Sequence, residues 1–174
     1  MSEKKDFGFT LVEMMVTVFI FLLLIGALFT VLATGSTSWQ IGDVRIELQQ
    51  ELRKGMDWIG GELRQGGTFT IEDVPADGSW YDKITFRKPQ DVIDGNVVWE
   101  NEEIQYLLGG SNDRQLLRKV DDEERILANN IISFQVRRQP TSPEIVEITL
   151  QADKRTVKGH IIELDLNFQI KLRN

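Results

Sequence analysis

An uncharged apolar run of twenty residues near the N-terminus is the feature that most constrains this chain. It extends from Met14 to Ala33, includes Phe19 and Leu23, and reads MMVTVFIFLLLIGALFTVLA. As a helix these residues span roughly 30 Å, about the thickness of the hydrocarbon core of a bilayer. The hydroxyls of its two threonines can bond back to helix carbonyls. The run therefore predicts a helix that crosses a membrane once.

The charges on either side of this run predict its orientation. Lys4 and Lys5 precede the run, and Asp43 is the first charged residue after it. The positive-inside rule then places the N-terminus in the cytoplasm and the residues beyond about 36 outside. We therefore expect a single-pass membrane protein whose C-terminal part lies outside the cytoplasm.

Length and composition narrow the class of protein. The chain has 174 residues, a formal net charge of -7, no cysteine and one histidine. A chain of this length is expected to form one domain with a single hydrophobic core. Its net negative charge makes nucleic acid an unlikely partner. The lack of cysteine excludes disulfides, thiolate catalysis and sulfur-ligated metals. No nucleotide-binding loop, nucleophile elbow, zinc-protease motif or paired-carboxylate motif is present, so no catalytic residue is assigned and we expect a protein that is not an enzyme.

An acidic residue, Glu13, stands directly before the apolar run. A carboxylate costs about 2.5 to 3.5 kcal/mol at the centre of a membrane helix and less near its end, so a compensating partner is expected. Two alternatives leave this acid unexplained. One is a secretory signal peptide with a small-x-small site at Ala33 to Gly35, although its apolar region is normally only about 7 to 15 residues. The other is a single-span anchor that holds an envelope enzyme.

The residues GFTLVE, from Gly8 to Glu13, resemble the signal of type IV prepilins and type II secretion pseudopilins. The match joins a short basic leader, Gly before Phe, an acid at the fifth residue after the cut, and an apolar helix. The resemblance implies that a membrane-embedded prepilin peptidase removes leader residues 1–8 after Gly8. It also implies that Phe9 becomes the N-methylated N-terminus and that Glu13 is the charged position of the family.

Electrostatics gives this acid a role in assembly. Cleavage would create an ammonium group on Phe9, and methylation keeps its positive charge. Phe9 and Glu13 are i and i+4 neighbours in a helix, so they can pair within one chain. In a filament, Glu13 of an incoming subunit can instead neutralise the Phe9 amine of the subunit above. Because an unpaired buried charge is costly, such pairing would select the axial register of the subunits.

Helical periodicity continues beyond the apolar run and predicts a helix up to about residue 63. Apolar residues recur on one face at Ile41, Val44, Leu48, Leu52, Met56, Ile59 and Leu63. We expect this face to pack on the protein's own sheet, and Gly66 and Gly67 to end the helix. The segment RIELQQELRKGMDWIGGELRQGG resembles the J-type minor pseudopilins and W-type minor pilins. The predicted division is a leader 1–8, a transmembrane and filament-core helix 9–35, and an extracytoplasmic domain 36–174 containing helix 39–65.

The remaining sequence changes to a period of two, which is typical of strands. Strands are expected at 84–88, 103–108, 114–120, 131–138, 144–150 and 160–172, with a turn at 109–113 and loop or short strand at 88–100 and 121–130. In the last strand apolar residues alternate strictly with polar ones, so one face should be buried and the other wet. The predicted class is α+β, a long N-terminal helix packed on an antiparallel sheet, as in pilins.

Three groups of polar residues are candidate binding sites. Asp91, Asp94 and Asn96, and the acidic run 121–124, offer oxygen ligands, but neither has EF-hand spacing. No cofactor is expected, with calcium as a minor alternative. Arg137 and Arg138 could touch DNA, although two arginines in an acidic domain more often serve as surface charge. His160 has no second ligand or nucleophile nearby in the sequence.

Together these patterns predict a structural minor pilin or pseudopilin in the tip or priming complex of a filament. The resemblance implies other minor and major subunits, the prepilin peptidase, the membrane and an inner-membrane assembly platform as partners. A membrane-anchored envelope enzyme and a DNA-uptake minor pilin remain the alternatives.

Overall fold

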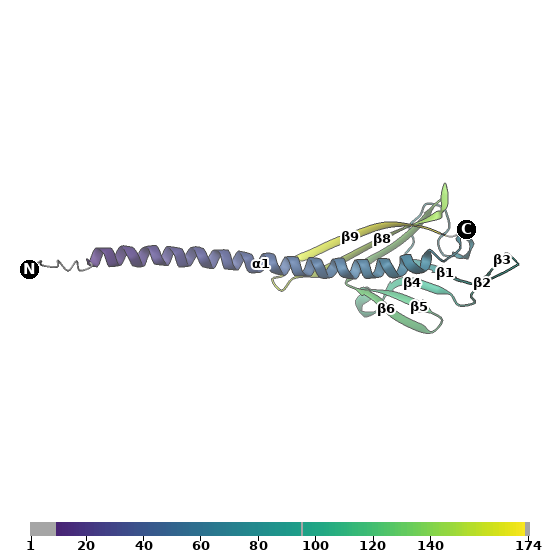
Figure 1. Ribbon diagram of the computed structural model, residues 1–174, viewed down its shortest axis with the longest axis horizontal. Coiled ribbons are helices and arrows are strands. Elements are labelled where there is room, and N and C mark those ends of the chain that lie inside the picture. Colours follow the sequence, from purple (N-terminus) through teal and green to yellow (C-terminus); the bar gives the residue numbers. More distant parts are fainter. Residues whose placement is uncertain (1–9, 95, 173–174) are drawn as a thin grey trace, which may run out of the picture. The chain divides into compact units, whose positions relative to one another are not determined.

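The computed structural model describes residues 10–94 and 96–172, which form one long α-helix followed by strands (Figure 1). Helix α1 extends from Leu11 to Leu63. The chain divides into two compact units, one up to Gln40 and one from Ile41 onwards. Gly8, Phe9 and the rest of the expected leader lie outside the described residues.

The first unit contains the apolar part of α1, which is long and apolar enough to cross a membrane. Its large side chains are exposed, including Phe19 at 63% and Leu23 at 60%. Thr17 donates its hydroxyl hydrogen to the Glu13 carbonyl at 2.7 Å, and Thr30 donates to Gly26 at 3.0 Å. The expected back-bonding of both threonines is thus confirmed, and these hydroxyls present no unsatisfied donor on the apolar surface.

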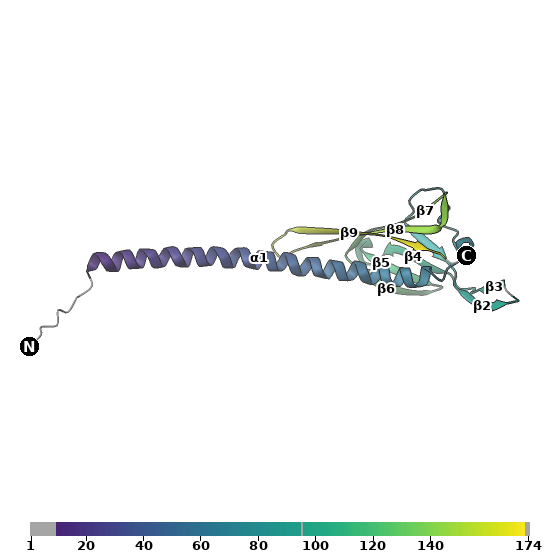
Figure 2. The same cartoon turned by 45° about the horizontal axis from the view of Figure 1, so that its top comes forward.

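The second unit combines the rest of α1 with three antiparallel sheets, which confirms the α+β class. The strands are β1 (Lys83–Phe86), β2 (Pro89–Ile93), β3 (Asn96–Trp99), β4 (Ile104–Gly109), β5 (Gln115–Val120), β6 (Glu123–Asn129), β7 (Ile131–Gln139), β8 (Ser142–Arg155) and β9 (Ile161–Lys171). One sheet has the order β1-β4-β5-β6, another β7-β8-β9, and β2 pairs with β3 alone. Figure 2 shows the β2-β3 hairpin standing apart from the two larger sheets. Two single-turn 3-10 helices lie at Thr68–Thr70 and Ser111–Asp113.

The structure extends the expected strands in three places. Segment 88–100 forms the β2-β3 hairpin, and segment 121–130 contains β6. Strand β8 starts before and ends after the expected 144–150, because its polar second half continues to pair with β9 as far as Arg155 opposite Ile161. The helix ends at Leu63, which confirms the end predicted from its apolar stripe and lies two residues before the bound given for helix 39–65. Its last turn is closed by Gly66, whose N–H donates to the Leu63 carbonyl at 3.0 Å.

The core lies between the second half of α1 and the two larger sheets. Leu48, Leu52, Ile59 and Leu63 are buried, which confirms the expected packing face, whereas Ile41, Val44 and Met56 of the same stripe are only partly buried. Gly55 has a packing role, because a Cβ there would lie 2.8 Å from Leu116 Cδ2. In β9 the expected alternation is present, but most of its inner face is half-buried.

Candidate functional site

The first turn of α1 is closed by a reciprocal cap between Thr10 and Glu13. Glu13 Oε2 accepts hydrogen bonds from the Thr10 backbone N–H and from its hydroxyl, each at 2.9 Å. The Glu13 backbone N–H points back to Thr10 Oγ1 at 3.3 Å. This is a capping box, T-x-x-E, which satisfies donors that the start of a helix leaves free. It gives Glu13 a local role that the sequence interpretation missed, although the spacing of the two residues was readable.

The cap uses only part of the hydrogen-bonding capacity of Glu13. Among the described residues, both bonds reach Oε2 and none reaches Oε1. An ionised carboxylate offers about four lone-pair positions over its two oxygens, so Glu13 can keep its cap and accept another donor. The first described turn can therefore hold a carboxylate ready for a cation. The expected cation is the ammonium of Phe9, which lies outside the described residues.

A second carboxylate, Glu62, lies at the other end of α1 and is buried between helix and sheet. Its side chain is 11% exposed and accepts two bonds from Arg118, Nε to Oε2 at 2.9 Å and Nη2 to Oε1 at 3.1 Å. Lys88 Nζ donates to Oε1 at 2.7 Å, and the Tyr106 hydroxyl donates to Oε2. Glu62 thus joins the last turn of α1 to β4, β5 and the residue pair between β1 and β2.

The ionised state of Glu62 is held by these donors. Burial alone raises the pKa of the carboxyl, but hydrogen bonds from Arg118, Lys88 and Tyr106 lower that pKa to about 2. The same contacts, added to burial, raise the pKa of Tyr106. Each charge in the cluster has an opposite charge beside it, and together these contacts fasten the last turn of α1 to the strands.

The two arginines proposed as a basic surface spot are both committed to internal contacts. Arg138 is buried, which corrects the expectation of surface charge; its guanidinium donates to the carbonyls of Pro143 at 2.8 Å, Val74 at 3.1 Å and Thr68 at 3.1 Å. Burial lowers the pKa of Arg138. Arg137 pairs with Glu147 and lies 4.3 Å from the ring centre of Trp80.

The remaining candidate groups stay apart. In the described part of the chain, no group of three or more His, Asp or Glu side chains could hold a metal. Asp94 has a φ of 51° at the end of β2, and Asp121 has a φ of 50° before β6, which are conformations that short polar side chains adopt in turns. Glu124 pairs with Lys119 at 3.0 Å. His160 is exposed, and its backbone, not its ring, contacts Thr156.

The comparison with protein-family models found one match, the prokaryotic N-terminal methylation motif, at residues 4–29. The matched segment contains the expected cleavage position, the capped first turn of α1 and most of the apolar run. Searches of curated proteins and of solved structures gave no match. The methylation motif therefore identifies the N-terminal segment, and the fold of the rest is known from the structure alone.

Proposed function

We propose that this chain, which carries the N-terminal methylation motif that is a hallmark of type IV pilins and pseudopilins, is a minor subunit of such a filament. The subunit is a non-enzymatic component of a type II secretion pseudopilus or a type IV pilus and acts in its tip or priming complex. Prepilin peptidase cleaves after Gly8 and methylates Phe9. The helix 9–35, including Met14, Phe19, Leu23 and Ala33, spans the inner membrane before assembly and forms filament core afterwards.

The observation that carries this proposal is that the methylation motif occurs together with an apolar helix whose large side chains are exposed. Residues 11–40 of α1 contain no buried side chain, although most are large and apolar. Such a surface must face lipid or other apolar helices. A filament of pilin-type subunits supplies both environments in turn, first the membrane and then the helices of neighbouring subunits.

Glu13 is the proposed assembly residue. Its Oε2 remains in the Thr10 cap while Oε1 accepts the methylated ammonium of Phe9 from a neighbouring subunit. In an apolar layer this pairing removes two unpaired charges at once, so it fixes the register between neighbours. The partners are other minor and major subunits and an inner-membrane assembly platform, and the domain 36–174 lies on the extracytoplasmic side.

Mass spectrometry of the N-terminus of the native protein tests processing. We expect the chain to begin with N-methyl-phenylalanine at position 9. A Gly8→Val variant should keep its leader, because a β-branched side chain replaces the residue before the cut. Gly26→Val is the matched control, since no atom lies within 4 Å of a Cβ at Gly26. An unmodified start at Met1 or Ser2 in the native protein would contradict the proposal.

A second experiment separates assembly from processing. Glu13→Gln should be cleaved normally but recovered in filaments at least about tenfold less, since one unpaired buried ammonium costs well over the 1.4 kcal/mol of a tenfold change. Asp43→Asn, at an exposed acid beyond the apolar run, is the control. Equal recovery of both variants in sheared filament fractions would remove Glu13 from assembly.

A further inference from the structure

The last strand, β9, has an outer edge of free backbone groups. It closes the β7-β8-β9 sheet and pairs with β8 over eleven residues without a register shift. Leu172 donates its N–H to the Glu144 carbonyl at 2.8 Å, so the even-numbered positions of β9 share hydrogen bonds with β8. The N–H and C=O groups of the odd-numbered positions therefore point away from the sheet. They belong to Ile161, Glu163, Asp165, Asn167, Gln169 and Lys171.

Among the described residues, no other strand pairs with this edge. No backbone bond from 161–171 leads anywhere except to β8. Strand β9 also has no proline and no bulge, the usual devices that protect an edge. Two other edges are protected: β6 has a bulge in its pairing with β5, and its Asn129 N–H is taken by Glu51, while β7 meets Tyr81 through a bridge at Val136.

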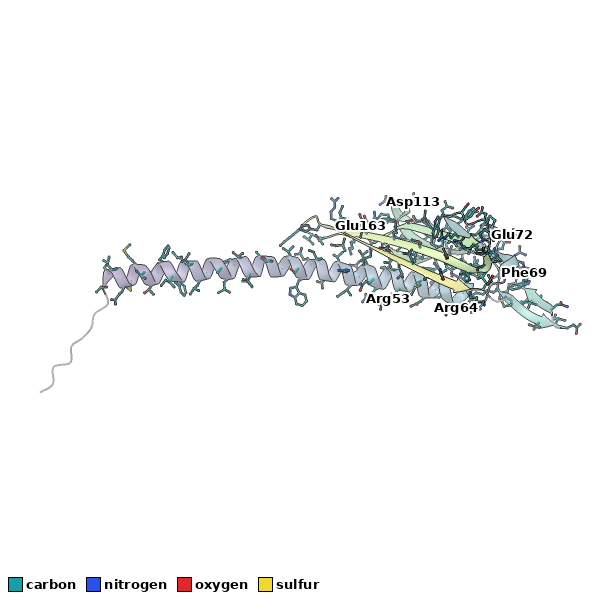
Figure 3. All side chains as sticks on the ribbon, turned by 90° about the horizontal axis from the view of Figure 1, so that it is seen from above. Arg53, Arg64, Phe69, Glu72, Asp113 and Glu163 are labelled. Atoms are coloured by element: carbon teal, nitrogen blue, oxygen red, sulfur yellow. The ribbon has the colours of Figure 1, made fainter. Side chains whose placement is uncertain are left out.

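The apolar layer beneath β9 is also open on this side. Four inner-face residues are only half-buried, namely Ile162, Leu164, Leu166 and Phe168. A groove of about 180 Å³ runs between the end of β9 and α1, lined among others by Met56, Gly60, Gly61 and Arg64. Gly61 borders open space here, because a Cβ at this position would meet no atom within 4 Å. Figure 3 labels Arg64 near the end of β9 and Glu163 near its start.

The charges on the outer face of β9 indicate the composition of a partner. Glu163 lies directly opposite Asp153 of β8, and like charges in that position are destabilising. Asp153 is paired with Arg114, whereas neither Glu163 nor Asp165 has a cationic partner among the described residues. A lysine or arginine on a strand next to β9 could pair with Glu163 and Asp165, for which β8 supplies no cation.

We propose that β9 accepts an extended strand of a partner protein along this edge, a strand with basic residues on its outer face and apolar residues toward the groove beside α1. The odd-numbered backbone groups of β9 hold the strand, Glu163 and Asp165 select its charge, and the groove takes its apolar side chains. The pairing requires neither cleavage nor filament assembly. Its failure would therefore leave the proposed function untouched.

Hydrogen exchange on the full chain in detergent micelles tests this pairing, with a synthetic peptide of alternating lysine and valine as the probe. The peptide should slow exchange of the odd-numbered β9 amides at least about tenfold, because each acquires an acceptor. Amides of Leu164 and Leu166, already bonded to β8, should change little. An analogue in which glutamate replaces lysine should bind more weakly, and that preference should fall in a Glu163→Gln, Asp165→Asn double variant.

A matched pair of variants isolates the backbone bond. Asn167→Pro removes one outward N–H and should abolish the protection, whereas Asn167→Val keeps the N–H and should bind normally. Both variants lose the 2.6 Å bond from Thr149 to Asn167, so that loss cancels. Unchanged exchange at Leu164 and Leu166 shows that the strand remains folded.

Three results would overturn the proposal. One is unchanged exchange at the odd-numbered amides, and another is equal protection by the acidic and basic peptides. The third is protection of the same amides by raising the protein concentration without peptide, which would assign the edge to a second copy of this chain.

Discussion

The two halves of α1 share one backbone geometry and have opposite surroundings. In residues 11–40 no side chain is buried, although this half is the more apolar. In residues 41–63 the buried positions recur every three or four residues and include Leu48, Leu52 and Ile59. Hydrophobicity alone therefore does not decide which half is covered by the chain itself. The second half is amphipathic and has a sheet to cover it, whereas the first is apolar all round and requires an external apolar environment.

Replacing a leucine by alanine should give the largest difference in folding stability between the two halves of α1. Leu52→Ala should lower the free energy of unfolding of the domain by about 3 kcal/mol, because the side chain is 3% exposed and leaves a cavity. Leu23→Ala should leave it unchanged. Urea unfolding of the full chain in mild detergent, followed by tryptophan fluorescence, measures both. A similar loss in the two variants would mean that the apolar half is packed against the domain.

Substitution of Glu62 should give the next largest loss of stability, and the size of this loss should depend on pH. Glu62→Gln should cost about 2 kcal/mol at pH 7, because Arg118 and Lys88 lose their counter-charge at a site where Glu62 is buried and both cations are partly buried. The pKa of Glu62 is lower in the folded state than its usual 4.5, so its stabilising effect is complete above pH 4.5 and is lost as pH falls toward about 2. The difference in the free energy of unfolding between the unchanged chain and the Glu62→Gln variant should therefore shrink as pH falls over that range.

The control for Glu62 is an exposed ion pair. Glu103→Gln removes the partner of Arg87, where both side chains are at least 40% exposed, and should leave stability nearly unchanged because water screens the pair. Denaturation curves at several pH values compare the two variants. A loss at Glu62 that does not vary between pH 2 and 5 would contradict the ionised cluster.

Glycine substitution should give a smaller effect. Gly55→Ala gains about 1 kcal/mol of helix propensity but places its Cβ 2.8 Å from Leu116, so the net cost should be about 1 kcal/mol. Gly26→Ala meets no neighbour and should leave the stability of the domain unchanged. Thermal unfolding of both variants in the same detergent would show this, and a stabilised Gly55→Ala would mean that Leu116 moves aside easily.

Removal of the helix cap should give the smallest effect. Thr10→Ala removes the hydroxyl that donates to Glu13 Oε2 and accepts from the Glu13 N–H, and should cost about 1 kcal/mol of local helix stability, which frays only the first turn. Thr17→Ala, which loses a bond within an intact helix, is the matched control. Amide exchange at residues 11–14 separates the two, and identical exchange rates there would contradict the cap.

The periodic parts of the chain could be predicted from the sequence. The apolar run, the stripe from Leu48 to Leu63 and the alternation of β9 each repeat a local pattern that a helix or strand imposes. The β2-β3 hairpin also has a local signal, an Asp-Gly step with β-branched residues on both sides, in a segment predicted as loop or short strand. The roles of Gly8, Phe9 and Glu13 stay predictions.

The parts that could not be predicted depend on contacts between distant segments. Glu62 meets Lys88, Tyr106 and Arg118, which follow it by 26, 44 and 56 residues. Its place between Ile59 and Leu63 on the buried face was readable, but the partners that make its burial tolerable were not. Arg138 is similar, because the carbonyls that it binds at Val74 and Thr68 precede it by 64 and 70 residues.

The Glu62 cluster has a mechanical consequence. A tension applied through α1 is carried first by the buried residues Leu48, Leu52 and Ile59. In the last turn it is carried by a carboxylate bonded to Lys88, Tyr106 and Arg118, so separate segments share the load before it reaches the two glycines that follow the helix. Several short bonds sheared together resist extension better than bonds opened one at a time. We therefore expect the domain of the Glu62→Gln chain to unfold at a lower force in single-molecule pulling from the N-terminus. An unchanged unfolding force would show that the Glu62 cluster carries no load.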